Sequence, residues 1–159
     1  MQMVTEIKVA IIALVGALSA LWGGLGWLVV GWVACMAIDY ISGSAAAAKA
    51  GEWSSAKARD GIWHKAGMIL VVVVSAIADA VMAEVVEHFP VVQLPFELSG
   101  LICSVVLVWY IFTELGSITE NAMEMGAPVP GWLSRLLAAG KNAVDAAGDA
   151  MAPGEKEEE

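Results

Sequence analysis

The chain has 159 residues, a formal net charge of −9 and a hydrophobic fraction of 59%, whereas soluble domains are usually about 45–50% apolar. Only 16% of the residues are charged, which is too few to cover a folded body of this size, so we expect much of its surface to face lipid. With 8 Lys and Arg against 17 Asp and Glu, the charge also argues against binding to nucleic acid, whose phosphates attract basic surfaces.

An uncharged stretch of 30 residues, 9–38, opens the apolar part of the chain. As one helix it would be about 45 Å long, which exceeds the hydrocarbon core of a bilayer, about 30 Å. Glycines at positions 23, 24 and 26 interrupt it near its middle. We therefore expect an N-terminal apolar helix within residues 1–24 and a first membrane span over residues 25–42.

The N-terminal helix, residues 6–22, has two alternative placements. It either lies in the membrane interface or crosses the bilayer as a fourth span. A cleaved signal peptide is a competing interpretation, because Lys8 precedes the apolar run and because Ala17 and Ser19 are small enough for a cleavage site.

Two further spans are expected over residues 66–83 and 98–113. The first contains a run of valines, which is helical in a bilayer because its backbone hydrogen bonds must close within the segment. The second ends near Trp109 and Tyr110, which suit the membrane interface. The chain is thus predicted to be an all-α membrane protein with three transmembrane helices, or four if the N-terminal helix also crosses.

The basic residues predict the orientation of these spans. The loop after the first span contains Lys49, Lys57, Arg59 and Lys65, whereas residues 84–97 contain neither Lys nor Arg. By the positive-inside rule, the basic loop faces the cytoplasm, the 84–97 hairpin faces outward, and the C-terminal part of the chain returns to the cytoplasm.

Glycine and proline mark the end of the third span, at Gly126, Pro128 and Pro130. Apolar residues then recur at helical spacing, so residues 127–150 are expected to form a short amphipathic helix on the cytoplasmic face. The acidic run in residues 151–159 is typical of a solvated, disordered tail.

The sequence shows no pattern of an enzyme active site. GxSxG, HExxH and P-loop patterns are all absent. His64 and His88 are expected on opposite sides of the membrane, and Cys35 and Cys103 lack metal-ligand or disulfide spacing. We therefore expect no catalytic, cofactor-binding or metal-binding residues.

Several polar and small residues are candidates for helix packing or for lining a pore. Asp79 stands within the second span, where a mid-membrane carboxylate costs about 2.5–3.5 kcal/mol. Its face of the helix either packs on other copies and lines a wet path, or brings the carboxylate to nearby headgroups. Small residues let helices approach closely in lipid. The candidates are Ser75, Asp79 and Ala83 in the second span, Gly16 and Ala20 in the N-terminal helix, and Gly100 and Ser104 in the third span.

Two sequence elements stand out together. They are Asp-Tyr-x-x-Gly, at Asp39, Tyr40 and Gly43, and Glu-x-x-Ser-Ile-x-Glu-Asn before Gly-x-Pro-x-Pro, at Glu114, Ser117, Glu120, Asn121, Gly126, Pro128 and Pro130. Both resemble elements of the phage holin family, which also includes toxin-secretion holins, and they occur here in the family's order. The resemblance covers residues 22–137 and implies a holin-like transmembrane domain over residues 25–126. Gly116 departs from the family pattern, where a bulky residue is usual, and the tail is acidic where many holin tails are basic.

The resemblance implies a small multi-pass protein of the bacterial inner membrane that is not an enzyme. It would self-associate and permeabilise the membrane, releasing an endolysin or a toxin and triggering lysis of the host cell. Its partners would be its own copies and the lipid bilayer, and the endolysin would not need to touch it. The alternatives are a structural or scaffold membrane protein that makes no hole, and a small ion channel.

Overall fold

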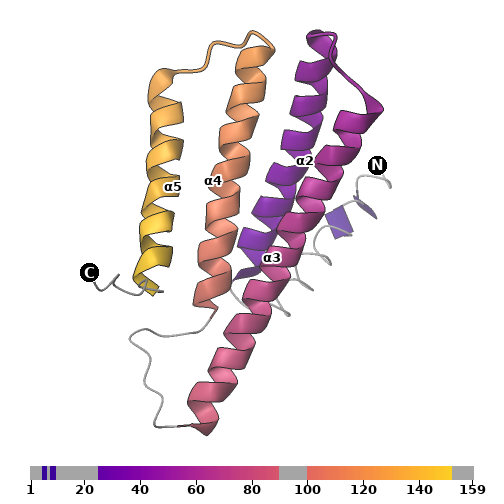
Figure 1. The fold of residues 1–159 in the computed structure, drawn as a ribbon. Helices are drawn as coiled ribbons and strands as arrows, with labels where there is room; N and C mark the ends of the chain where they lie inside the picture. The colour runs from indigo at the N-terminus through magenta and orange to yellow at the C-terminus, as the bar shows by residue number, and fades with distance from the viewer. Residues whose placement is uncertain (1–4, 7, 10–24, 90–99, 152–159) are drawn as a thin grey trace, which may run out of the picture.

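The computed structural model describes residues 5–6, 8–9, 25–89 and 100–151. These ranges hold four long helices and no strand. Three of the helices are long and apolar enough to cross a membrane, which confirms the expected all-α fold. The helices are α2 (Gly26–Lys49), α3 (Ser55–His88), α4 (Leu101–Glu124) and α5 (Gly131–Met151), of which α2, α3 and α4 are the candidate spans (Figure 1).

Two expected segments fall outside the described residues. One is the N-terminal apolar helix, with its candidate packing residues Gly16 and Ala20, and the other is the acidic tail from residue 152 onward. The fourth span therefore stays a prediction from the sequence.

The three spanning helices are longer than the hydropathy pattern predicts, and all three are longer at the same end of the bundle. α2 continues to Lys49 instead of ending near residue 42. α4 continues beyond the expected membrane span, which ends at residue 113, to Glu124 next to the expected glycine and proline stop. α3 begins at Ser55 instead of residue 66. Hydropathy marks only the part of a helix that suits lipid, whereas backbone hydrogen bonds continue until a capping group ends them.

Glycine and serine set the ends of these helices. Gly51 and Gly126 follow α2 and α4 with left-handed φ angles of 73° and 89°, a conformation that favours glycine just past a helix. The Ser54 hydroxyl accepts a hydrogen bond from the backbone N–H of Lys57 at 3.2 Å and caps α3. The end of α4 at Glu124 agrees with the stop predicted from the glycine and prolines that follow it.

Successive helices run antiparallel, so two turns lie at one end of the bundle (Figure 1). We call this the turn end; it holds residues 50–54 and residues 125–130. The amine of Lys49 donates a hydrogen bond to the backbone oxygen of Met125 and joins the two turns. α4 packs against α2, α3 and α5, which makes it the central helix of the described bundle.

An uncharged core fills the space where α2, α3 and α4 meet. Leu107 is its most deeply buried side chain, and Trp32 stacks on Tyr110 with ring centroids 5.9 Å apart. The outer surface of α3 is apolar too, since Leu70 and Val74 are mostly exposed. A helix that is apolar on both its inner and outer faces suits lipid. The core residues are Val29, Trp32, Met36, Met68, Val72, Cys103 and Leu107.

Candidate functional site

One charged residue from each spanning helix meets at the turn-end side of the apolar core. The amine of Lys65 on α3 donates to Asp39 Oδ2 on α2 at 2.9 Å. It also donates to both carboxylate oxygens of Glu114 on α4, at 2.7 and 2.8 Å, and Glu114 is only 3% exposed. We call these three residues the charge cluster. Because each belongs to a different helix, the cluster joins all three spans.

A second set of contacts fastens α4 to α2 beside the charge cluster. The side-chain amide of Asn121 donates to Asp39 Oδ1 at 3.0 Å and to the Ser42 hydroxyl at 3.0 Å. A Cβ added at Gly43 would lie 3.4 Å from the Asn121 amide nitrogen, an ordinary van der Waals contact, so Asn121 lies directly against α2 at this position. Ser117 adds a side-chain hydrogen bond to Asp39. The carboxylate of Asp39 is therefore bonded from both α3 and α4.

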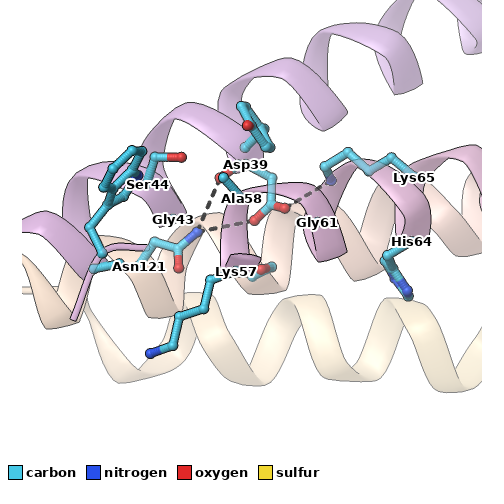
Figure 2. A pocket seen from close by; sticks show the side chains of 13 residues that line it. Asp39, Gly43, Ser44, Lys57, Ala58, Gly61, His64, Lys65 and Asn121 are labelled. Atoms are coloured by element: carbon cyan, nitrogen blue, oxygen red, sulfur yellow. Dashed lines mark hydrogen bonds and ion pairs between the residues drawn. The ribbon is translucent and has the colours of Figure 1, made fainter. Parts of the chain in front are cut away.

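A cavity of about 210 Å³ opens between α2 and α3 next to these residues (Figure 2). In this view Asp39 lies between Asn121 and Lys65, with dashed lines to both. Tyr40 approaches α3 on the same side, since a Cβ added at Gly61 would lie 3.6 Å from its ring. The Asp-Tyr-x-x-Gly element thus contacts both neighbouring helices.

The charge cluster has one cation for two carboxylates, so its net charge is −1 when all three groups are ionised. Transfer of an ion out of water is so costly that buried pairs persist only with good hydrogen-bond geometry, and removing one partner costs about 3–5 kcal/mol. Lys65 donates to three carboxylate oxygens, which uses the full donor capacity of an ammonium group. The cluster is thus a helix-joining device that depends on Lys65.

The ion pair between Lys57 and Glu52 offers a contrast at the turn end. Its two atoms are 2.9 Å apart, but the side chains are 59% and 67% exposed. The hydrogen bond from Lys57 holds the pKa of Glu52 below its usual value. Exposed pairs of this kind contribute little to stability because water screens them, so this pair is a suitable reference for the charge cluster.

Asp79 joins α3 to α4 at the opposite end of the core. Its two carboxylate oxygens accept the backbone N–H groups of Ile102 at 3.0 Å and Cys103 at 2.8 Å. These are first-turn donors that have no acceptor within their own helix, and a negative charge is favourable at a helix N-terminus. The buried carboxylate of Asp79 therefore caps α4 from the neighbouring helix, a contact that the sequence interpretation did not include.

The other described packing candidates also lie near the start of α4 or on the outside. Ser75 is buried and donates to the backbone oxygen of Val72 at 2.8 Å, while Ala83 is exposed. Gly100 precedes α4 with a left-handed φ of 73°, and the Ser104 hydroxyl bonds the backbone oxygen of Gly100 at 2.5 Å. These contacts lie within one chain, and a role in packing between copies or in lining a pore stays a prediction.

The charge cluster and Asp79 bracket the uncharged core. Lys65 and Asp79 are 14 positions apart on α3, and no charged residue lies between them, so the axial distance is about 21 Å. On α4 the uncharged part runs from Leu101 to Thr113, just before Glu114. This layer is the part of the bundle that suits the hydrocarbon core.

The expected C-terminal helix forms as α5, and one of its faces packs along α4. Trp109 Nε1 donates to Asp145 Oδ1 at 2.5 Å, and the amine of Lys141 lies 4.3 Å from the centre of the Trp109 ring. Gly140 is close to Phe112, whose ring would lie 2.5 Å from an added Cβ. None of residues 131–151, all of which the structure describes, is buried. A position of this helix on the cytoplasmic face stays a prediction.

The contacts of α5 are weak compared with the cost of its charges in lipid. An exposed hydrogen bond contributes about 0.5–1.5 kcal/mol, and an exposed cation–π contact about 0.5–1 kcal/mol. A single aspartate near the middle of a span costs about 2.5–3.5 kcal/mol. Next to Trp109, α5 is therefore stable only if its charged side is in water.

The structure brings most of the family-motif residues together and separates the rest. Asp39, Gly43, Glu114, Ser117 and Asn121 meet at the charge cluster. Tyr40 packs toward α3 beside it. The remaining motif positions are Glu120, which is exposed near the end of α4, and Gly126, Pro128 and Pro130, which form the turn before α5.

Sequence reasoning missed the role of Lys65, which it used only to orient the spans. One signal was present, since Lys65 directly precedes the second apolar run. A lysine there lies next to the membrane on the same side as Asp39 and Glu114, the acidic residues at the ends of the other two uncharged runs. The contact between Trp109 and Asp145 had no comparable signal.

Similarity to known proteins extends over most of the chain. The model of the bacteriophage holin family matches residues 16–142, a range that contains the charge cluster and Asp79. The chain is 33% identical over 124 residues to "Uncharacterized protein BH0965" of Halalkalibacterium halodurans, and the match covers 78% of this chain and 85% of that protein. No match to a solved structure was found.

Lys65→Met keeps much of the side-chain volume but leaves the buried carboxylate of Glu114 and the partly buried one of Asp39 without a cation. We expect the free energy of unfolding in detergent micelles to fall by about 3–5 kcal/mol, measured by denaturant titration of helical circular dichroism. Lys57→Met is the matched control, with a much smaller expected loss because water screens its exposed ion pair. Equal effects of the two variants would contradict the assignment. Adding Asp39→Asn and Glu114→Gln to Lys65→Met should recover part of the loss.

Proposed function

The chain belongs to the bacteriophage holin family, and on this premise we propose that it assembles in the bacterial inner membrane and permeabilises it. An endolysin then reaches the cell wall and the host cell lyses. Holins permeabilise a membrane without catalysis, and the three membrane-spanning candidates α2, α3 and α4 agree with a holin-type membrane protein. The same mechanism would serve a toxin as cargo.

The observation that carries the proposal is the pairing of polar groups within a single chain. In the described part of the bundle, the charge cluster and the Asp79 cap pair the buried carboxylates of Glu114 and Asp79 and the partly buried charges of Asp39 and Lys65. An apolar core lies between them, and the exposed side of α3 is apolar as well. On α3, one chain therefore offers lipid an apolar surface, and its described core offers water no continuous polar route. Permeabilisation then requires several copies.

Assembly in lipid needs contacts other than apolar area. Hydrocarbon solvates an apolar helix as well as another helix does, so association depends on close packing and polar contacts. Gly31 on α2 and Gly67 on α3 have no neighbouring atom within 4 Å of an added Cβ, so another helix can approach there. Homo-oligomerisation through such positions is part of the proposal.

The orientation we propose follows from the basic residues. Lys49, Lys57, Arg59 and Lys65 lie at or near the turn end, so this end faces the cytoplasm. The charge cluster then lies on the cytoplasmic side of the apolar layer and Asp79 on the outer side. Its partners are its own copies and the lipid bilayer, and the endolysin passes through the opening without needing a binding site.

Inducible expression with and without a cytosolic muralytic enzyme tests this function. We expect abrupt lysis, followed by optical density, only when both proteins are made, because the hole supplies the path and the enzyme the cell-wall cleavage. The enzyme expressed alone is the control. Steady growth with both proteins would reject the holin function and favour a scaffold. Leakage of potassium without release of the enzyme would favour a small ion channel.

Asp79→Leu tests whether the carboxylate matters to opening as well as to folding. The change leaves the N–H groups of Ile102 and Cys103 without their acceptor, a cost of about 1–3 kcal/mol, and makes α3 more apolar. We therefore expect normal membrane insertion with altered timing of lysis, scored at equal protein level. Ser75→Ala, a change to a buried neighbour on the same face, is the control. Unchanged timing for Asp79→Leu would count against this role.

A further inference from the structure

The charged side of α5 lies at the depth of the uncharged layer. Asp145 accepts its hydrogen bond from Trp109, which is five positions before Glu114 on α4, about 7.5 Å further into the layer. Asp149 lines a cavity of about 320 Å³ together with Val71 of α3 and Val105 of α4. In a membrane-spanning bundle, these carboxylates would therefore lie beside the hydrocarbon core.

The packing of α5 does not hold it there when lipid surrounds the chain. A second cavity, of about 370 Å³, lies under the other half of α5, next to Gly116 and Leu137. Every residue in 131–151 is exposed or only partly buried. With the two cavities, this makes the interface between α5 and α4 loose over the length of α5. Ionised side chains at membrane depth need water or a charged partner. The packed position of α5 is thus favoured only when water reaches its charged side.

We propose that α5 lines the water path of the assembled protein, with Lys141, Asp145 and Asp149 facing water, and that it leaves α4 for the membrane surface when lipid surrounds a single chain. This inference rests on the proposed function and identifies the helix that lines the water path. α5 is thus a two-state element, packed on α4 or released to the membrane surface. Water at membrane depth favours the packed state because it solvates the charges of α5. Asp145 and Asp149 follow residue 142, where the family match ends.

Side chains of α5 suit both positions. Half-buried Leu137 and Val144 line the two cavities beside α4 and therefore face α4 in the packed state. Trp132 and Leu136 are 60% and 58% exposed in that state. An exposed tryptophan beside a leucine suits the headgroup region of a membrane, so the same helix has an apolar anchor for the released state.

Thiol labelling during current recording in planar bilayers tests the lining. In a Cys35→Ala, Cys103→Ala background, Asp145→Cys and Asp149→Cys each place one thiol on the charged side of α5. Ala147→Cys is the matched control, because it lies about 200° around the helix from either position. We expect a negatively charged, membrane-impermeant methanethiosulfonate to shift the reversal potential toward cation selectivity at positions 145 and 149, and a positively charged one to shift it the opposite way.

The control at position 147 should show no such shift. If the protein conducts but its reversal potential shifts equally after labelling at all three positions, or at none, α5 does not line the path. That result leaves the proposed function standing. A parent chain that never conducts overturns both. Asp145→Lys in the native background tests the lining without cysteine chemistry. It should shift the ion selectivity toward anions, whereas Ala147→Lys should not. A shift with Ala147→Lys and none with Asp145→Lys overturns the proposal.

A disulfide tests which position of α5 belongs to the open state. Trp109→Cys with Asp145→Cys places one thiol on each helix at the contact of the native side chains. Because two cysteines are shorter than a tryptophan and an aspartate, a short dithiol linker joins them by disulfides on oxidation and releases them on reduction. If the packed helix lines the path, the oxidised protein still conducts, and reduction does not increase the current. If oxidation abolishes conduction and reduction restores it, α5 must leave α4 for opening and the proposal is overturned.

Discussion

The pairing of a partly buried lysine with one buried and one partly buried carboxylate fixes the geometry on which the rest of the bundle depends. Asp39, Lys65 and Glu114 come from three helices that are otherwise joined by apolar contacts. Apolar contacts are tolerant of rotation and sliding, whereas an ammonium group bonded to three oxygens is not. At the other end of the uncharged core, the Asp79 carboxylate fixes the start of α4 against α3 in the same way. α4 is thus held at both ends of the layer that suits hydrocarbon.

In the proposed function, this arrangement accounts for a single chain that stays closed until it assembles. Its charged groups are paired within one copy, and its outer surface on α3 is apolar. The proposal makes water at membrane depth the property that distinguishes assembled from single chains. α5, with its charged side next to Trp109, is the described element that would respond most directly to that water.

Hydropathy, glycine positions and basic residues were enough to predict three spans and an all-α fold, because these follow from local composition. The same pattern underestimated α2, α3 and α4 at the turn end, where helices continue through polar residues until Gly51, Ser54 and Gly126 end them. The family motifs identified Asp39, Glu114 and Asn121 but not their partner Lys65, since pairing depends on how the helices are rotated and aligned. The partners of Asp79 are backbone N–H groups, which every residue except proline carries, so no sequence signal identifies them. For α5 the apolar spacing predicted an amphipathic helix; both a membrane surface and the side of α4 satisfy that spacing.

The central claim is that a single chain is closed and that several copies are needed to open a membrane. Reconstitution into vesicles at increasing protein-to-lipid ratio, with an entrapped enzyme as cargo, measures this directly. The account predicts no release at low density and a steep onset above a threshold, because opening requires many copies together. Release that rises in proportion to the number of chains from the lowest density, or no release at any density, would contradict it.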